Sequence, residues 1–289
     1  MNTIVIRALA KINLAIDVLD KREDGYHDID MVTVPLMLHD SVEITPLPGS
    51  FETYLYCDDP SIVCDESNLA FKALDAMRDS FKFDGHYRIF IYKKIPVQAG
   101  LGGGSADAAA VIRALESHVI KSGDNLDKIN ELAMNIGSDV PFCFYDRPAR
   151  VRGKGERLDF IKVAYPYFVL IVKPDFGLST KSVYEAYDNI KEGIHHPNIE
   201  ALIHALEVDD TDGIKKNMIN VLSVPAIKAL PLIGELLEEM EMMNLSLCGM
   251  SGTGSACFAL SKDRRQLEKA AHLFEKEGYQ TELTQFVVR

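Results

Sequence analysis

Residues 96 to 110 read Pro-Val-Gln-Ala-Gly-Leu-Gly-Gly-Gly-Ser-Ala-Asp-Ala-Ala-Ala, with glycine at positions 100, 102, 103 and 104. Residues 87–93 alternate as a strand does, and residues 106–116 favour a helix. Glycine permits positive φ and lets backbone N–H groups approach an anion, because no Cβ atom intervenes. With Ser105 as the expected N-cap, the helix would direct its positive dipole end at the glycines. The sequence therefore predicts a phosphate-binding loop between a strand and a helix.

This loop differs from the two common nucleotide-binding fingerprints. A Gly-x-Gly-x-x-Gly pattern that starts at Gly100 would need glycine where Ser105 stands, and the Gly-Lys-Ser/Thr of a Walker loop occurs nowhere in the chain. The alternative interpretation is a tight turn that only starts a helix. Four glycines followed by a capped helix favour phosphate binding over that alternative.

Length and composition set the broad class. A chain of 289 residues with 47% hydrophobic residues has enough apolar material for two domains, and we expect a boundary near residue 160. The formal charge of -12 disfavours nucleic acid and anionic membranes as partners. Five cysteines without a Cys-x-x-Cys pair, and no charged-then-apolar leader or membrane-length apolar run, indicate a cytoplasmic protein. We expect a monomer or a weak homodimer.

The order of elements favours the α+β class, because strands and helices are mixed without the regular alternation of a doubly wound sheet. We expect a proline-broken segment at Pro141 that begins a strand, and a solvated loop at 209–213. The expected strands cover 3–18, 29–46 in two pieces, 87–93, 165–172, 244–250, 257–260 and a last one from 281. One helix is expected to open within 65–77 after a polar cap region, and the other expected helices cover 106–116, 127–136, 180–189, 199–206, 226–242 and 263–277.

Three segments together resemble one kinase family. The polar face of the first strand with Lys11 and Asn13, the loop at residues 96–110, and Gly-Met-Ser-Gly-Thr-Gly-Ser-Ala-Cys-Phe at residues 249–258 resemble, in order, the motifs of the small-metabolite kinases named for galactose, homoserine, mevalonate and phosphomevalonate. The resemblance extends over essentially the whole chain. It implies an N-terminal domain like ribosomal protein S5, a ferredoxin-like C-terminal domain and an active site between them, with residues 1–160 as the ATP-binding and catalytic domain and residues 161–289 on the substrate side.

Finer details resemble one branch of this family. Ala-Lys-Ile-Asn-Leu at 10–14, Asp-Gly-Tyr-His at 24–27 and Gly-Ser-Asp-Val-Pro-Phe at 137–142 are typical of kinases that phosphorylate a cytidine diphosphate sugar alcohol in non-mevalonate isoprenoid biosynthesis. By this resemblance, Asp139 is the base that takes the hydroxyl proton and Lys11 lies beside it. A lysine there would keep Asp139 ionised and offset negative charge on the transferring group. Without the resemblance, a strand-face lysine and a helix-capping aspartate are the commoner interpretations.

The resemblance also implies which residues bind ATP and Mg²⁺. Residues Gly100, Leu101, Gly102, Gly103, Gly104 and Ser105 should cradle the phosphates, and Asn68 corresponds to the adenine-side loop of the family. Ser105 is a candidate contact of Mg²⁺, and no side-chain metal ligand is assigned. Asp107 poses a problem, because a carboxylate in the first helical turn suits the dipole but repels a triphosphate. Either it points away from the phosphates or it lies near the metal, and the sequence leaves both open.

On the substrate side, the family stacks cytosine between aromatic rings and reads its edge with a histidine. Tyr26 and His27 match that motif, and Tyr184 is the expected second ring. Asn13 and Gly252 are expected on the sugar-alcohol and sugar-phosphate side. Taken alone, these residues would be a half-buried tyrosine, a surface histidine and a glycine turn between two strands.

The sequence disfavours two other functions. Another kinase of the family, for homoserine or mevalonate, is disfavoured by the Gly-Tyr-His segment at 25–27 and the four-glycine loop. A catalytically inactive sensor is disfavoured because Lys11 and Asp139 are both present. The sequence thus predicts a small-molecule kinase.

Overall fold

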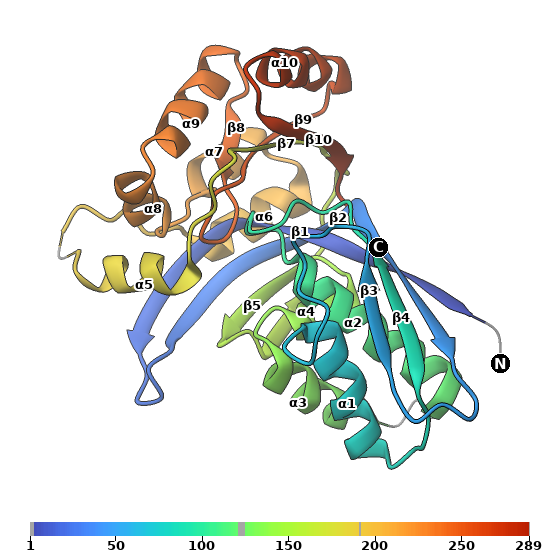
Figure 1. The fold of residues 1–289 in the computed structure, drawn as a ribbon. Coiled ribbons are helices and arrows are strands. Elements are labelled where there is room, and N and C mark those ends of the chain that lie inside the picture. The colour runs from blue at the N-terminus through green and yellow to red at the C-terminus, as the bar shows by residue number, and fades with distance from the viewer. Residues whose placement is uncertain (1–2, 121–124, 191, 289) are drawn as a thin grey trace. The chain divides into compact units, whose positions relative to one another are not determined.

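The structure is a computed structural model that describes residues 3–120, 125–190 and 192–288, and its chain divides into two compact units. Unit 1 comprises Met1–Ala10, His39–Ile95 and Gly102–Asp146, and unit 2 comprises Lys11–Leu38, Pro96–Leu101 and Arg147–Arg289. Strands β1 (Ile4–Lys21) and β2 (His27–Pro46) pair with each other and contribute residues to both units. Both strands are blue in Figure 1.

The strands of unit 1 bury alternate side chains. Strand β3 (Tyr54–Cys57) runs parallel to β4 (Tyr87–Tyr92), and β4 pairs antiparallel with Ser41–Pro46 of β2. In β4, every second residue from Tyr87 to Ile91 is buried, which is the period of a strand with one face on a core. The strand expected before the glycine loop is therefore confirmed.

The central helix of unit 1 is α2 (Gly103–Leu115), which follows the glycine loop and packs against α1 (Leu69–Phe81) and α4 (Val140–Tyr145). Every residue of α2 from Ala106 to Leu115 except Arg113 is buried. Its alanines let the neighbouring helices approach closely, because their side chains are short. A π-helical turn (Glu116–Ile120) and α3 (Leu126–Ile136) complete the helices that are described in this unit.

Unit 2 contains a four-stranded antiparallel sheet in the order β10-β7-β9-β8, with β7 (Phe168–Lys173), β8 (Leu247–Met250), β9 (Cys257–Ser261) and β10 (Gln280–Gln285). Along the chain the order is strand, helices, two strands, helix and strand, which is the ferredoxin-like pattern. The same unit pairs Ile29–Thr33 of β2 with β5 (Ala149–Gly153), and β5 with β6 (Arg157–Phe160).

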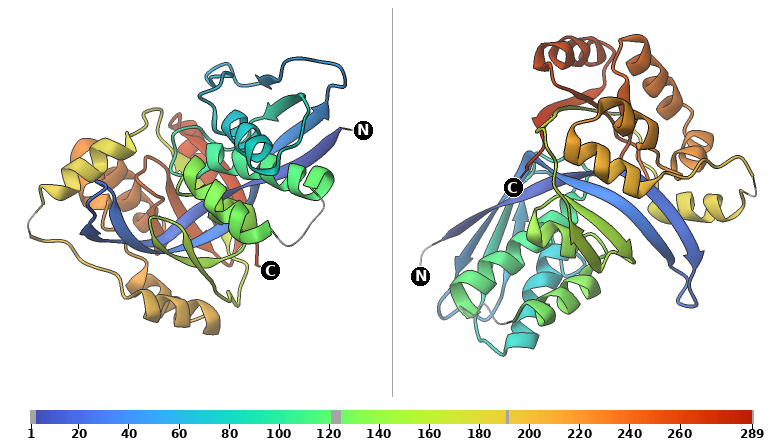
Figure 2. Two further views of the ribbon diagram at one scale, coloured as in Figure 1. Left: turned by 90° about the horizontal axis from the view of Figure 1, so that it is seen from below. Right: turned by 180° about the vertical axis from the view of Figure 1, so that it is seen from behind.

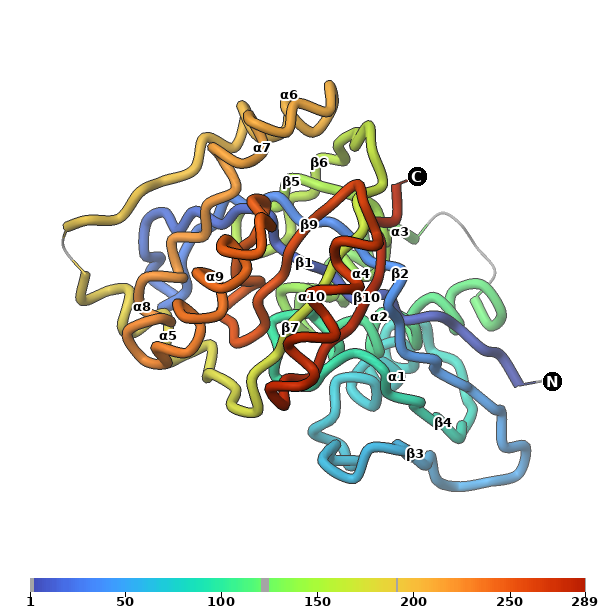
Figure 3. Tube along the Cα trace, turned by 90° about the horizontal axis from the view of Figure 1, so that it is seen from above, coloured from blue at the N-terminus to red at the C-terminus, as the bar shows by residue number. Residues whose placement is uncertain are grey.

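Helix α10 (Arg264–Lys276) covers the four-stranded sheet, as the view from above shows (Figure 3). Its buried residues Leu267, Ala270, Ala271 and Phe274 recur at helical spacing and form the face that packs on the sheet. The other helices of unit 2, in yellow to orange in Figure 2, are α5 (Thr180–Asp188), α6 (Ile199–Val208), α7 (Thr211–Asn217), α8 (Ser223–Ala229) and α9 (Leu232–Met242). The α+β class expected from the sequence is confirmed.

Five local expectations are wrong. The two strand pieces expected over 29–46 form the single strand β2, and each of the other four fails for a physical reason. Helix α2 begins at Gly103, so Gly102, with φ 72°, takes the cap position expected for Ser105. Pro141 lies in the first turn of α4 instead of starting a strand, because a first-turn residue needs no N–H partner. The single helix expected over 226–242 is broken into α8 and α9 at Pro231, which cannot sit in a helix interior. The loop expected at 209–213 begins α7 at Thr211.

Candidate active site

A buried lysine defines the first part of the site. Lys11 is only 3% exposed, and its Nζ donates to Asn13 Oδ1 at 2.8 Å and to the Gly100 carbonyl at 3.0 Å. Lys11 and Asn13 lie on the same face of β1, because side chains two residues apart in a strand point the same way. The backbone N–H of Lys11 also donates to the carbonyl of Leu101 at 3.0 Å. The ammonium is therefore fixed next to the first half of the glycine loop.

Asn13 orients this ammonium from a buried position. The side-chain amide of Asn13, 1% exposed, donates from Nδ2 to Thr33 Oγ1 at 2.9 Å and to Met31 Sδ at 3.2 Å. Since these donors set which way the amide faces, Oδ1 is directed at Lys11. Both ends of the amide thus bond protein groups, and its expected contact with the sugar alcohol stays a prediction.

The loop between β8 and β9 packs directly on the glycine loop within unit 2. Ser251 Oγ donates to the Gly100 carbonyl at 2.9 Å and accepts from the Asn13 backbone N–H at 3.3 Å. A Cβ atom on Gly100, whose φ is +73°, would lie 2.2 Å from the Ser251 carbonyl oxygen, and one on Gly252 would lie 3.1 Å from the Gly100 carbonyl oxygen. Glycine is therefore required at Gly100 for backbone packing as well as for its positive φ. The segment 251–255 is buried and also forms the turn between two strands, as the alternative interpretation expected.

The second half of the glycine loop belongs to unit 1 and begins α2. A Cβ atom on Gly103 would approach Lys93 Nζ and Ile95 at 3.2 Å, so this residue is enclosed. A Cβ atom on Gly104 would meet only Leu69 Cδ1, at 3.7 Å, which is an ordinary contact. Gly104 is exposed and Ser105 is half-buried. The loop is thus backed by packed atoms at Gly103 and open at Gly104, as a phosphate cradle requires.

A buried cluster of two carboxylates and one ammonium lies next to Gly103. Lys93 Nζ donates to Asp40 Oδ2 at 2.5 Å and to Asp107 Oδ2 at 3.0 Å, and Asp40 Oδ1 accepts the backbone N–H groups of Lys94 and Ile95. Asp107 therefore points into the core of unit 1, which decides between the two orientations that the sequence left open. We name this group the Asp40–Lys93–Asp107 cluster.

The electrostatics of the cluster follow from its burial. Burial raises the pKa of Asp107 to about 7, against the lowering effect of Lys93. Burial lowers the pKa of Lys93, but the charges of Asp107 and Asp40 outweigh it, so the pKa of Lys93 is raised overall. The ammonium therefore stays charged, and Asp107 titrates near neutrality.

Asp139 precedes the buried helix α4 within unit 1. It occupies the N-cap position and is half-buried, but its carboxylate forms no capping hydrogen bond with α4. The interpretation of Asp139 as a helix cap is thus not supported. A Cβ atom on the nearby Gly137 would lie 3.9 Å from Ser105 Oγ and 4.0 Å from Leu69 Cδ1, so the turn before Asp139 lies close to the start of α2.

Asn68 is a helix cap in unit 1. Its Oδ1 accepts from the backbone N–H of Ala70 at 2.9 Å, and its Nδ2 donates to the carbonyl of Val63 at 2.8 Å. These bonds fix the start of α1 and the loop before it. If Asn68 contributes to the adenine side of the ATP site, it therefore does so by holding the conformation of this loop.

The residues expected to bind the pyrimidine lie in unit 2. His27 stacks on Tyr184 with ring centroids 5.5 Å apart and an interplanar angle of 25°. Tyr26 precedes His27 and is 63% exposed, with Lys154 Nζ 5.5 Å from its ring centroid. The structure thus brings His27 and Tyr184 together and presents Tyr26 as an exposed aromatic face.

The sequence interpretation missed three charged residues, Asp40 and Lys93 of the Asp40–Lys93–Asp107 cluster and Asp188 beside His27. Asp188 accepts from His27 Nε2 at 2.7 Å. Its signal was available, because positions 184, 187 and 188 share one face of the expected helix at 180–189. Asp40 and Lys93 are far apart in the chain, and only the tertiary structure brings them to Asp107.

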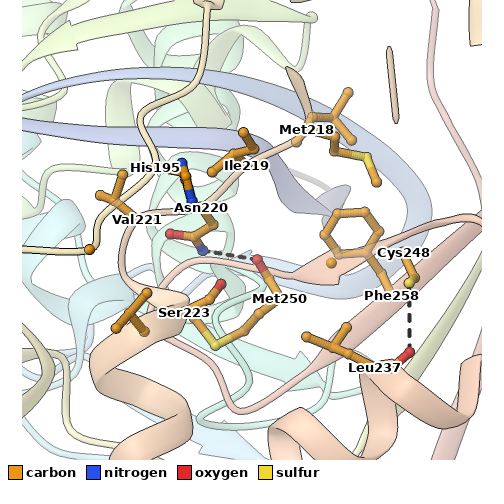
Figure 4. Close-up of a pocket in the computed structure, with 14 residues that line it drawn as sticks. His195, Met218, Ile219, Asn220, Val221, Ser223, Leu237, Cys248, Met250 and Phe258 are labelled. Carbon is orange, nitrogen blue, oxygen red and sulfur yellow. Dashed lines mark hydrogen bonds between the residues drawn. The ribbon is translucent and has the colours of Figure 1, made fainter. Parts of the chain in front are cut away.

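Unit 2 also contains a cavity of about 400 Å³ (Figure 4). Leu14 lies in its wall, and in β1 this side chain points to the face opposite Lys11 and Asn13. The wall is mostly apolar, with Met218, Leu237 and Phe258, and the amide of Asn220 donates to the carbonyls of Met250 and Gly252. Because its amide donor is already used to hold the β8–β9 loop, Asn220 supports the fold of the site.

The site offers few side-chain ligands for Mg²⁺ among the described residues. Among the residues that the structure describes, no three His, Cys, Asp or Glu side chains converge as a metal site. Mg²⁺ is commonly held by few protein groups together with substrate phosphates. The half-buried hydroxyl of Ser105 at the start of α2 fits such a minor ligand, whereas Asp107 is already paired with Lys93. None of the helices in the described parts of the chain is long and apolar enough to span a membrane.

Comparison with known proteins places the chain in a class. Residues 68–147 match the model of the N-terminal domain of GHMP kinases, and residues 192–280 match the model of their C-terminal domain. A crystal structure of homoserine kinase from Cytophaga hutchinsonii shares the fold, with a TM-score of 0.79, 18% identity, and coverage of 100% of this chain and 95% of that chain. The fold and the two domain matches define an ATP-dependent small-molecule kinase of the GHMP class.

The nearer relatives identify the family within that class. A 4-diphosphocytidyl-2-C-methyl-D-erythritol kinase from Geobacillus thermodenitrificans is 36% identical, over 91% of this chain and 90% of its own, and one from Clostridium kluyveri is 38% identical, over 90% and 91%. A crystal structure of 4-(cytidine 5'-diphospho)-2C-methyl-D-erythritol kinase superposes with a TM-score of 0.81 and 31% identity, over 98% of this chain and 99% of that chain. The chain belongs to the family of 4-diphosphocytidyl-2-C-methyl-D-erythritol kinases.

Proposed function

We propose that this kinase transfers the γ-phosphoryl group of ATP to the 2-hydroxyl group of 4-diphosphocytidyl-2-C-methyl-D-erythritol, a step of non-mevalonate isoprenoid precursor biosynthesis. The observation that carries the proposal is the buried Lys11, held at 2.8 Å by Asn13 and at 3.0 Å by the carbonyl of Gly100 in the glycine loop. A fixed ammonium beside a phosphate loop is what phosphoryl transfer needs, because the reaction depends on positioning and on neutralising charge.

Asp139 and Lys11 have separate roles in the proposed reaction. The Asp139 carboxylate accepts the proton of the substrate hydroxyl, whose oxygen then forms a bond to the γ-phosphorus while the bond to ADP breaks. Lys11 offsets the negative charge that spreads over the transferring group. Asn13 contributes by keeping the Lys11 ammonium in one direction.

ATP binding is assigned to the glycine loop. Backbone N–H groups from Gly100 to Ser105 would contact the phosphates, and the loop that Asn68 holds would lie on the adenine side. Mg²⁺ would neutralise phosphate oxygens, with Ser105 as its candidate protein ligand. Residues 1–160 are thus the proposed ATP-binding and catalytic domain, and residues 161–289 the substrate-side domain.

The substrate is bound through its nucleobase and its sugar alcohol. Tyr26 and Tyr184 supply aromatic surface to cytosine, and His27 reads its edge. Asn13 is proposed on the side of the sugar alcohol, and Gly252 on the sugar-phosphate side. The charge of -12 supports a small-molecule partner over nucleic acid, and we propose a cytoplasmic monomer or weak homodimer.

A coupled assay of ADP release tests the proposal. With the purified protein, ATP and Mg²⁺, we expect turnover with 4-diphosphocytidyl-2-C-methyl-D-erythritol and none with homoserine or mevalonate. Turnover with homoserine or mevalonate alone would assign the protein to another substrate. Ligand binding without ADP release from any of the three would make it a sensor.

A further inference from the structure

His27 is held on three sides by groups from one face of helix α5. Its side chain is 7% exposed, and its Nε2 lies 2.7 Å from Asp188 Oδ1. Tyr184 stacks on the ring, and Tyr187 meets it edge-on with centroids 6.5 Å apart at 85°. Residues 184, 187 and 188 of α5 are spaced as i, i+3 and i+4, so one helix face supplies all three contacts. These contacts therefore fix the orientation of the imidazole ring.

Asp188 is kept ionised by a second partner. Its Oδ2 accepts from Lys21 Nζ at the end of β1. The hydrogen bond from Lys21 lowers the pKa of Asp188, with His27 adding to the effect, and partial burial opposes it. An ionised carboxylate only accepts hydrogen bonds, so Nε2 of His27 must be the donor. In a neutral imidazole the other nitrogen, Nδ1, is then an acceptor.

We propose that Asp188 is a positioning residue that fixes His27 in the Nε2–H tautomer, and thereby selects a cytosine over a uracil base. The proposal rests on the proposed function. An Nδ1 acceptor matches the exocyclic amino group of cytosine, which donates, and mismatches the carbonyl oxygen that uracil carries in the same place. A site built around one hydrogen-bond direction rejects the analogue that reverses it, because a buried polar group is left unpaired.

The first test needs no substitution and no activity. Nitrogen-15 NMR of the full chain at pH 8 reports the proton position on the ring of His27. We expect one protonated nitrogen, Nε2, and one unprotonated nitrogen, Nδ1. An Nδ1–H tautomer or a doubly protonated ring in the wild-type protein would overturn the proposal whatever the substrate is.

The second test compares Asp188→Asn with a matched control, Glu185→Gln. Glu185 lies on the same helix, pairs with Lys181 and has a side chain that is 64% exposed. For Asp188→Asn we expect an Nδ1–H population at His27, a KM for the cytidyl substrate about tenfold higher, and a kcat within about twofold of wild type. We also expect the ratio of kcat/KM between the cytidyl substrate and its uridyl analogue to fall about tenfold or more. Glu185→Gln should change none of these.

A conservative variant tests the positioning role of Asp188, and the possible failures of the two proposals can be told apart. Asp188→Glu restores an ionised acceptor, so it should return the tautomer and part of the base preference. If Asp188→Asn leaves both the tautomer and the base preference unchanged, the positioning role is wrong. If the wild-type enzyme does not use the cytidyl substrate, the proposed function is wrong, and the NMR result for Asp188 still stands by itself.

Discussion

The carbonyl oxygen of Ser251 lies where a methyl group on Gly100 would need to be, 2.2 Å from its ideal Cβ position. These two residues are separated by 151 positions in the chain, and Ser251 Oγ also donates to the Gly100 carbonyl. That same carbonyl accepts from Lys11 Nζ at 3.0 Å. The Gly100 peptide thus links the β8–β9 loop to the lysine of the site.

Gly100→Ala is expected to lower stability and activity together. The alanine methyl must displace the Ser251 backbone, and a positive φ adds roughly 1–2 kcal/mol of strain. We expect a thermal midpoint several degrees lower and a kcat at least about tenfold lower, because the acceptor of Lys11 moves.

Gly49→Ala is the matched control for that substitution. Gly49 has a similar φ of +77° but no atom within 4 Å of its Cβ position. It should show the backbone strain alone, with normal turnover. Equal losses in the two variants would mean that the contact with Ser251 is not what requires glycine at position 100.

Much of this architecture could be predicted from the sequence, because local patterns encode it. The alternation of residues 87–93 and the alanines after Gly104 give β4 and α2. The contact of Gly100 with Ser251 could not be predicted, since glycine was explained locally by an anion and the packing partner is distant. Pro231 did carry a local signal for the break between α8 and α9, which the helical periodicity of 226–242 obscured.

Asp139→Asn is expected to lower kcat at least about a hundredfold, because an amide cannot take up the hydroxyl proton. The protein should keep its fold, since the carboxylate does not cap α4. The coupled assay and far-UV circular dichroism measure the two effects. Asp84→Asn, at an exposed position of the same unit, is the control and should have normal kcat. Near-normal turnover in a folded Asp139→Asn protein would reject Asp139 as the base.

Tyr26→Ala is expected to raise the KM for the cytidyl substrate about tenfold, with little change in the KM for ATP. Stacking of a base on an aromatic ring contributes about 1–3 kcal/mol, and Tyr26 is exposed, so its removal should leave the core intact. Steady-state kinetics at varied concentrations of each substrate separate the two constants. Tyr54→Ala removes a partly exposed tyrosine from unit 1 and should leave both KM values as they are. An unchanged KM for the cytidyl substrate in Tyr26→Ala would remove this tyrosine from the pocket.

The site was less predictable than the fold, because its chemistry depends on residues brought together from distant segments. Asp107 shows this: the sequence placed it in the helix after the glycine loop, but its direction depends on Lys93, whose pKa is raised by Asp107 and Asp40 against the effect of burial. His27 likewise has its hydrogen-bond partner, Asp188, 161 residues away in the chain. Local motifs identify such residues, whereas only the folded chain shows what each one bonds.

The Asp40–Lys93–Asp107 cluster predicts how stability changes with pH. Burial raises the pKa of Asp107 from 3.8 to about 7, so the folded protein holds a proton that the unfolded chain has already released in this range. Its contribution is fully present below about pH 4 and is lost as the pH rises to about 7. Asp107→Asn cannot ionise, so its thermal midpoint relative to wild type should rise between pH 5 and about pH 7.5.

Asp59→Asn tests the opposite sign in the same unit. Hydrogen bonds from Ser61 lower the pKa of Asp59, so its carboxylate stabilises the fold above the ordinary pKa and loses that effect as the pH falls. The thermal midpoint of Asp59→Asn should therefore lie furthest below that of wild type at neutral pH, and the difference should shrink toward about pH 3. It should be small because Asp59 is near the surface.

A midpoint difference for Asp107→Asn that stays constant, or that falls between pH 5 and about pH 7.5, would show that Asp107 is ionised throughout this range and that Lys93 outweighs its burial.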